Sequence, residues 1–199
     1  MTASYVLKKV PLTELYLDPN NPRYSELGEG TRKVPEGRVR EDGVQRKARE
    51  RLALANLELD KLQDSIRTVG FLPIDPMIVV PLPDAHSYMV IEGNRRLAAL
   101  KQVAEDQESG EIDLDPSIFK TIRTVNVLVV DSEDEQERNH LARVFQGVRH
   151  VSGVKPWGPY QQAGLISSMS DDGRSMQDIK EALGLSAKRI NVLHKVYSA

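Results

Sequence analysis

Two adjacent arginines, Arg95 and Arg96, follow a run of apolar residues and precede a leucine- and alanine-rich segment, in the stretch IEGNRRLAAL over residues 91–100. This change of pattern predicts a strand followed by a helix. The first turn of a helix has unpaired backbone N–H groups and a partial positive charge, and Gly93 lets a ligand approach the backbone closely. Two guanidinium groups add to this charge, so the junction suits a phosphate group. The alternative is that Arg95 pairs with Glu92 or with the acidic segment downstream.

A second candidate site lies near the end of the chain, in MQDIKEALGLSAKRINVLHKVY over residues 176–197. Its apolar spacing predicts two short helices with Gly184 at the bend, the first capped by Ser175 and the second by Ser186. This is the pattern of a helix-turn-helix, whose second helix carries donors suited to phosphates and base edges. We therefore predict DNA contacts from Gln177, Ser186, Lys188, Arg189, Asn191, His194 and Lys195. The alternative is a purely structural helical hairpin.

The composition limits the other classes of function. Cysteine is absent, which excludes disulfides, thiolate zinc sites and a cysteine nucleophile, and suits a reducing cytoplasm. No stretch approaches the ~18 apolar residues of a membrane span, and the first residues have no secretory signal pattern. The net charge of −2 conceals uneven segments, because residues 32–51 and 174–195 are basic and residues 101–137 are acidic. A near-neutral total therefore does not argue against a nucleic-acid partner.

Strands are predicted where β-branched residues gather, and helices where apolar residues recur at helical spacing. The expected strands lie within residues 5–17, 77–82, 87–92 and 124–131, and the expected helices are 44–68, capped by Gly70, and 95–108. Residues 25–42 hold several glycines, prolines and charges, so we expect a mobile insertion there.

After Asp131 the pattern predicts helices only. Ser132 is expected to cap the first, with Glu135 completing a capping box, and Pro159 is expected in the first turn of the second. The predicted fold is α+β, a small α/β domain followed by an all-helical domain. The predicted domains are 1–131, which binds the nucleotide and carries an insertion at 25–60, and 132–199, which binds DNA through a helix-turn-helix at 175–197.

Several segments resemble, in order, the boxes of the ParB family of chromosome- and plasmid-partition proteins. IEGNRRLAAL resembles the family's GERRxxA box, SIRTVGFLPIDPMIVV its SIxxxGLLxPIxV segment, and DPNNPR its NPxQPR box. VNVLVVD resembles the strand after the arginine box, and RVFQGVRHVSGVKPW stands where the family has ENxxRxxLNPxE. The chain resembles a divergent branch of this family, whose N-terminal domain shares its fold with the sulfiredoxins.

The resemblance implies a nucleotide switch, in which CTP or a related nucleoside triphosphate, with Mg²⁺, closes a dimeric clamp around DNA. Gly93, Arg95 and Arg96 match the phosphate box, and Asn94 replaces its acidic residue. Arg149 matches the arginine of a second phosphate motif. The nucleotide-binding set implied is Gly70, Phe71, Leu72, Pro73, Glu92, Gly93, Asn94, Arg95, Arg96, Gln146, Arg149 and His150.

The sequence departs from the family at the positions associated with metal and hydrolysis. Phe145 stands at the family's glutamate and Gln146 at its asparagine. Phenylalanine coordinates no metal, so we expect no metal ligand from the protein and at most a weak NTPase. Glu92 is the candidate for a replacement carboxylate.

These observations predict a bacterial-type, nucleotide-dependent DNA-binding protein that acts as a clamp or as a partition or regulatory factor. Its expected partners are double-stranded DNA, a nucleoside triphosphate and a second copy, joined through a C-terminal region missing from this chain. We expect no membrane contact and a cytoplasmic location on the nucleoid or a plasmid. The alternatives are a ParB-like nuclease and a plain helix-turn-helix adaptor without nucleotide switching.

Overall fold

The computed structural model divides the chain into two compact units. The first comprises Ser4–Asn21 and Thr31–Asp131, and the second takes in the chain from Ser132 onward. The residues described are 4–22, 24, 33–54, 59–72, 75–83, 86–132, 134–151, 159–183, 185, 186, 190, 192 and 193. That the two units are a nucleotide-binding and a DNA-binding domain remains a prediction.

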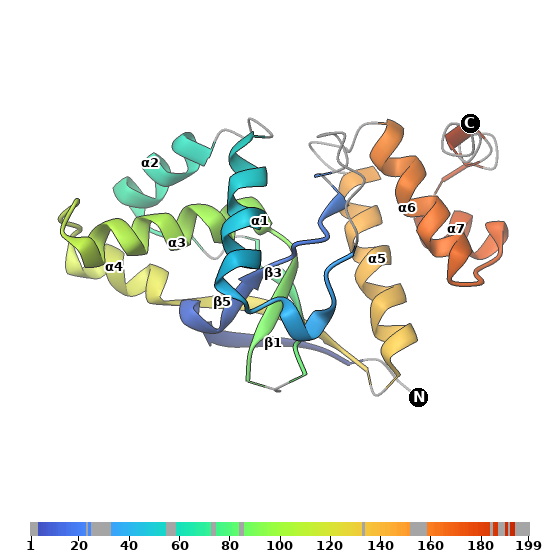
Figure 1. Ribbon diagram of the computed structural model, residues 1–199, viewed down its shortest axis with the longest axis horizontal. Coiled ribbons are helices and arrows are strands. Elements are labelled where there is room, and N and C mark those ends of the chain that lie inside the picture. Colours follow the sequence, from blue (N-terminus) through green and yellow to red (C-terminus); the bar gives the residue numbers. More distant parts are fainter. Residues whose placement is uncertain are drawn as a thin grey trace. The chain divides into compact units, whose positions relative to one another are not determined.

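Five strands of the first unit form one mixed sheet in the order β1-β5-β3-β4-β2 (Figure 1). They are β1 (Ser4–Pro11), β2 (Leu15–Leu17), β3 (Met77–Pro81), β4 (Tyr88–Glu92) and β5 (Thr124–Asp131). Two pairs of neighbouring strands are antiparallel, β1 with β5 and β3 with β4. The other two pairs, β3 with β5 and β2 with β4, are parallel. The predicted strands and the mixed α/β fold are thus confirmed.

β3 is the central strand because its residues are apolar on both faces of the sheet. Met77, Ile78, Val79 and Val80 are each at most 3% exposed. A continuous β-branched run of this kind is typical of a strand covered on both sides.

The described α-helices of the first unit are α1 (Asp42–Leu54), α2 (Leu59–Val69), α3 (Asn94–Ser109) and α4 (Pro116–Arg123). The short 3-10 helices η1 (Leu12–Glu14) and η3 (Glu36–Arg38) lie in the connections. Figure 1 shows α2, α3 and α4 grouped beside one another. α3 is the most buried helix of this group, with Leu97, Leu100 and Val103 inaccessible to solvent.

The single helix predicted over 44–68 is wrong, because α1 and α2 are separate helices. Each packs its own apolar face: α1 contacts β2 and α3, whereas α2 contacts α3 and α4. The cap predicted at Gly70 is confirmed, since Gly70 has a φ of 77° and its N–H donates to the carbonyl of Ile66 at 2.9 Å.

The prediction that residues 25–42 form a mobile insertion is wrong where the structure describes them. Val39 is fully buried, and the amide of Asn20 exchanges two hydrogen bonds with the backbone of Val34. Gln45 of α1 likewise donates to and accepts from the backbone of Leu17. This part of the chain is therefore built into the unit; residues 25–32 lie outside the described part.

The second unit contains α5 (Glu135–Val151), α6 (Pro159–Asp171) and α7 (Met176–Leu183). Its core joins α6 and α7 to two residues further along the chain, Ile190 and Leu193. Gly147 permits the close approach of these helices, because a Cβ there would overlap the side chain of Leu183 and lie 2.8 Å from Leu165. The predicted position of Pro159 in the first turn of α6 is confirmed.

The predicted cap of α5 is wrong. The helix begins at Glu135, and Asp134 caps it by accepting a hydrogen bond from the N–H of Gln136 at 2.8 Å. Ser132 lies two residues before Asp134, and its hydroxyl donates instead to the Glu137 carboxylate. The cap predicted for α7 is confirmed, because the Ser175 hydroxyl accepts from the N–H of Asp178. None of the helices that the structure describes is long and apolar enough to cross a membrane.

Candidate functional site

The arginine junction, defined as Glu92 to Arg96, joins the end of β4 directly to the start of α3. Gly93 makes this sharp turn with a φ of 100°, in the left-handed region. A Cβ at Gly93 would lie 2.7 Å from the Cγ of Met77 and 3.0 Å from an Nη atom of Arg96. Only glycine therefore fits, and no side chain caps the first turn of α3.

Asn94 holds the junction in place from within. It is 4% exposed, its Oδ1 accepts from the N–H of Asp18 at 2.9 Å, and its Nδ2 donates to the carbonyl of Val90. These bonds tie the start of α3 to the chain after β2 and to β4. The side chain of Asn94 is thus committed to internal hydrogen bonds.

Asp18, which follows β2, is a buried carboxylate at the edge of this junction. It is 6% exposed, and its Oδ1 accepts from the N–H of Asn20 at 2.8 Å. Burial raises the pKa of the Asp18 carboxyl to about 6, and the bond from Asn20 offsets only part of that effect. Since no described basic side chain pairs with it, its charge is poorly compensated in the fold.

Arg96 connects the junction to the segment that follows α2. Its Nη1 donates to the carbonyl of Asp75 and lies 3.4 Å from the Asp75 carboxylate. The Arg96 side chain is 21% exposed, so the pair is only partly screened by water. Asp75 is therefore a partner of Arg96 that the sequence did not reveal.

Gly70 and Phe71, expected near the base of the nucleotide, are anchored to α4. The Thr121 hydroxyl accepts from the N–H of Phe71 at 2.9 Å, and a Cβ on Gly70 would lie 2.7 Å from the same oxygen. α4 itself was not predicted. Its signal is the sequence DPS, in which Asp115 accepts from the N–H of Ser117 and Pro116 occupies the first turn.

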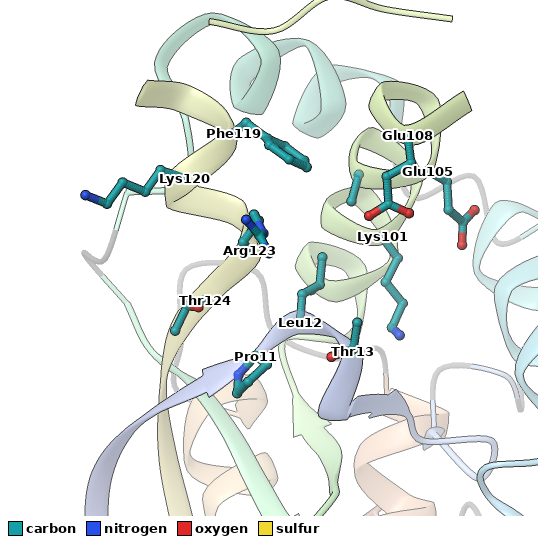
Figure 2. A pocket seen from close by; sticks show the side chains of 11 residues that line it. Pro11, Leu12, Thr13, Lys101, Glu105, Glu108, Phe119, Lys120, Arg123 and Thr124 are labelled. Carbon is teal, nitrogen blue, oxygen red and sulfur yellow. The ribbon is translucent and has the colours of Figure 1, made fainter. Parts of the chain in front are cut away.

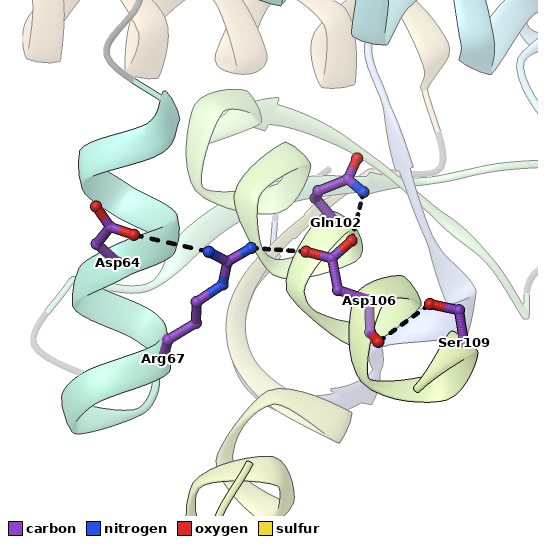
Figure 3. Close-up of polar contacts among 5 residues, drawn as sticks. All are labelled: Asp64, Arg67, Gln102, Asp106 and Ser109. Atoms are coloured by element: carbon purple, nitrogen blue, oxygen red, sulfur yellow. Dashed lines mark hydrogen bonds and ion pairs between the residues drawn. The ribbon is translucent and has the colours of Figure 1, made fainter. Parts of the chain in front are cut away.

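A polar cluster fixes α2 against α3 and so positions the segment that leaves α2 (Figure 3). Arg67 donates to the Asp106 carboxylate at 2.7 Å, and Gln102 donates to its other oxygen at 2.7 Å. The Asp106 side chain is 9% exposed, whereas Asp64, 3.7 Å from Arg67, is 75% exposed. The ion pair between Arg67 and the buried Asp106 carboxylate is therefore the main link between the two helices.

The structure places the predicted nucleotide-binding residues in both units. Glu92 and Arg95 are half-buried at the junction, and Leu72 is 52% exposed after α2. Gln146 is buried in α5 of the second unit. Pro73 and the side chains of Arg149 and His150 lie outside the described residues, so the predicted assembly of the full set stays a prediction.

Most of the predicted DNA-binding residues lie outside the described part of the chain: Lys188, Arg189, Asn191, His194 and Lys195. Gln177 is exposed on α7. The carbonyl of Ser186 accepts from the N–H of Ile190 at 3.1 Å, the spacing of a helical turn. Ile179, Leu183, Ile190 and Leu193 share one buried cluster.

The donors at the junction suit phosphate oxygens, since they comprise two arginines and the first N–H groups of α3. Metal ligands are not gathered there. In the described ranges, no group of three or more His, Asp or Glu side chains is placed to hold an ion. A magnesium ion brought by a triphosphate would keep phosphate and water oxygens as its main ligands.

Residues 32–142 match the family model of the ParB N-terminal domain. No curated protein matches the sequence. Among solved structures, a C-terminally truncated ParB from Caulobacter crescentus complexed with CTP-γ-S is 17% identical, with a TM-score of 0.38 over 97% of this chain and 79% of that one. The same protein complexed to the centromeric parS site gives a TM-score of 0.31 at 17% identity, over 96% of this chain and 72% of that one.

A pNOB8-like ParB N domain is 16% identical, with a TM-score of 0.43 over 91% of this chain, which spans only 50% of that protein's length. The family match covers more than half of the present sequence and includes the strands β3 to β5, all four α-helices of the first unit and the arginine junction. The chain therefore belongs to the ParB N-terminal domain family.

Proposed function

We propose that this protein is a ParB-type factor that binds a nucleoside triphosphate, CTP or a relative of it, at the arginine junction and double-stranded DNA through residues 175–197. The observation that carries the proposal is the junction itself. Gly93 turns β4 straight into α3, so that Arg95, Arg96 and the uncapped first turn of the helix lie together.

Binding at the junction rests on charge and on geometry. The uncapped N–H groups of α3 and the helix dipole favour an anion, and guanidinium groups donate two parallel bonds to phosphate oxygens. A phosphate on Arg96 competes with Asp75, which holds that guanidinium in the absence of ligand. Triphosphate binding therefore loosens the segment between α2 and β3.

The triphosphate carries its own Mg²⁺, which supplies charge neutralisation when it is bound. The protein's part is to hold the phosphates. The Phe145 side chain has no oxygen that could bind a metal, so hydrolysis is weak, and Glu92 is the candidate for any carboxylate that orients water. Phosphate release by the wild type and by Glu92→Gln measures this: negligible release from both supports a binding switch, and brisk release that Glu92→Gln abolishes identifies the acid.

Isothermal titration of the chain with CTP, ATP and GTP tests nucleotide binding. Arg95→Ala should weaken the preferred triphosphate by about ten- to a hundredfold, since a charge-assisted bond contributes roughly 1.5–3 kcal/mol. Arg95→Lys should also be impaired, because an ammonium lacks the planar fork. Arg46→Ala, a change of the same kind on the exposed face of α1, is the matched control and should bind normally.

Asp75→Asn sharpens the test. Removing the carboxylate that competes for Arg96 should tighten triphosphate binding, whereas Arg95→Ala loosens it. Equal affinity in the wild type, Arg95→Ala and Asp75→Asn contradicts a phosphate site at the junction.

DNA binding is tested by replacing the cations expected on the second helix of the motif. Lys188→Ala or Arg189→Ala should weaken binding and reduce the log–log salt slope by about one if the side chain neutralises one phosphate. Lys47→Ala on α1 is the control. If neither substitution affects binding to any DNA, the helical pair is only structural.

A second candidate function, a DNA-binding adaptor with a structural arginine junction, is favoured by one specific observation. Asn94 and Arg96 already use their side chains within the unit. In that case Arg96→Ala lowers the stability of the first unit, and no triphosphate produces heat in the titration.

A further inference from the structure

A hollow of about 500 Å³ lies in the first unit between η1, α3 and α4 (Figure 2). Leu12 and Thr13 of η1 lie on one side, Lys101 and Glu108 of α3 on another, and Phe119 of α4 faces them. The volume is within the range of small-molecule sites, roughly 300–1,000 Å³. The hollow is formed by one compact unit alone.

This hollow is separate from the arginine junction. Both use α3, but the junction takes its first turn, and the hollow takes residues from Lys101 to Glu108. At 1.5 Å per residue, these positions lie roughly 10 to 20 Å along the helix from Asn94. A ligand of the hollow therefore does not compete for the phosphate donors.

Lys101 borders the hollow, and its side chain runs beside Thr13 (Figure 2). Burial lowers the pKa of the Lys101 ammonium and the charge of Arg49 lowers it further, while Glu105 acts in the opposite direction. Glu105 compensates it only in part, because both of its oxygens accept from Arg49, at 2.6 and 3.0 Å. The ammonium also lies 5.4 Å from the centre of the Tyr16 ring.

Arg123 supplies a second positive charge. Its guanidinium lies 5.9 Å from the centre of the Phe119 ring, and no carboxylate in the described ranges forms an ion pair with it. Lys120 extends away from the hollow in Figure 2, so only its stem lines the wall. Two cations thus border an apolar surface formed by Leu12, Ala104 and Phe119.

We propose that this hollow binds a small amphipathic monoanion, whose flat apolar body packs on Phe119, Leu12 and Ala104 and whose acidic group pairs with Arg123. A polyanion is disfavoured, because Glu108 stands on the same wall without a basic partner among the described residues. A neutral apolar compound would not use the charge of Arg123, with which an acidic group forms a charge-assisted contact.

The probe for the test is 8-anilinonaphthalene-1-sulfonate, an aromatic dye with a single negative charge, titrated into the full chain by fluorescence. We expect saturable binding, weakened by about tenfold in Arg123→Gln, which removes a charge-assisted contact. Ala104→Phe should abolish binding by filling the hollow. Arg46→Gln, an exposed arginine on α1, is the matched control and should leave the dissociation constant unchanged.

Two further measurements identify the place of binding. In the wild type, the amide NMR signals of Thr13 and Phe119 should shift on titration. Leu7→Ser, which reduces the exposed apolar surface of β1, should leave binding intact. The proposal is overturned if the dye does not bind saturably, if excess CTP or Leu7→Ser removes it, or if Arg123→Gln and Ala104→Phe bind it as the wild type does.

Discussion

Asp18→Asn should stabilise the first unit at neutral pH. The Asp18 carboxyl is 6% exposed, and burial raises its pKa from 3.8 to about 6. A shift of about two pKa units corresponds to about 3 kcal/mol of unfavourable free energy for the ionised form. Asparagine keeps an oxygen for the N–H of Asn20 and carries no charge, so the substitution removes this cost.

The raised pKa of Asp18 also determines in which direction the stability of the wild type changes with pH. Below the unfolded pKa both states hold the proton, and ionisation costs the fold nothing. Between that pKa and about 6 the unfolded chain has ionised while the folded chain keeps its proton, so wild-type stability falls as pH rises. Above the pKa of Asp18 in the folded state, both states are ionised and the folded state bears the full free-energy cost of the buried charge. The advantage of Asp18→Asn should therefore grow across this window and then stay constant.

Urea unfolding at several values between about pH 4 and about pH 7.5 measures the advantage, with the amide signals of β3 and β5 reporting on the unit that contains Asp18. Glu50→Gln, on the exposed side of α1, is the control and should follow the wild type. Parallel profiles of the wild type and Asp18→Asn would refute the reasoning, because they would mean that the buried carboxyl ionises as easily as in the unfolded chain.

Three further substitutions test the packing. Gly93→Ala should cost about 2 kcal/mol or more in urea unfolding, because a φ of 100° disfavours a Cβ that would also meet Met77; an unchanged midpoint contradicts this. Asp106→Asn should cost about 1.5–3 kcal/mol, while Asp64→Asn, at a 75% exposed carboxylate, should change stability by less than about 0.5 kcal/mol. Gly147→Ala should lower the stability of the second unit by about 1–3 kcal/mol, as followed by the amide signals of α6 and α7; no loss would mean that the helices adjust freely.

The strands and α3 could be predicted because local sequence determines them. The β-branched run of β3 is buried on both faces, and β5 begins and ends at the residues expected. The break between α1 and α2 could not be predicted, since Leu52 and Ile66 keep helical spacing across it while their helices pack on different neighbours. The prediction of the α5 cap was wrong for a related reason. Ser132 and Asp134 are both good capping residues, and Asp134 is the cap because the helix begins at Glu135.

At the candidate site the sequence indicated residue types but not their partners. The two arginines and Gly93 were expected from the pattern of the junction, and the turn is built as that pattern requires. Asp75 and Asp18 were missed, because contacts between positions far apart in the chain leave no spacing signal. Asn94 was expected to face a ligand, and its buried amide bonds instead to Val90 and Asp18.

The edge strand β1 pairs with β5, which lies at the other end of the unit's sequence, and this affects how the unit folds during synthesis. Ser4 pairs with Asp131 and Pro11 with Thr124, so β1 cannot pair until β5, more than 100 residues later in the chain, has been synthesised. Until then Val6 and Leu7 lack the strand with which they pair in the fold. Such distant pairing slows folding and leaves unpaired strands open to association with other chains. A fragment trimmed to residues 32–142, the extent of the family match, would also have an unpaired strand. It lacks β1 and β2, so β5 becomes a bare, valine-rich outer strand, and we expect that fragment to aggregate where the longer chain stays dispersed.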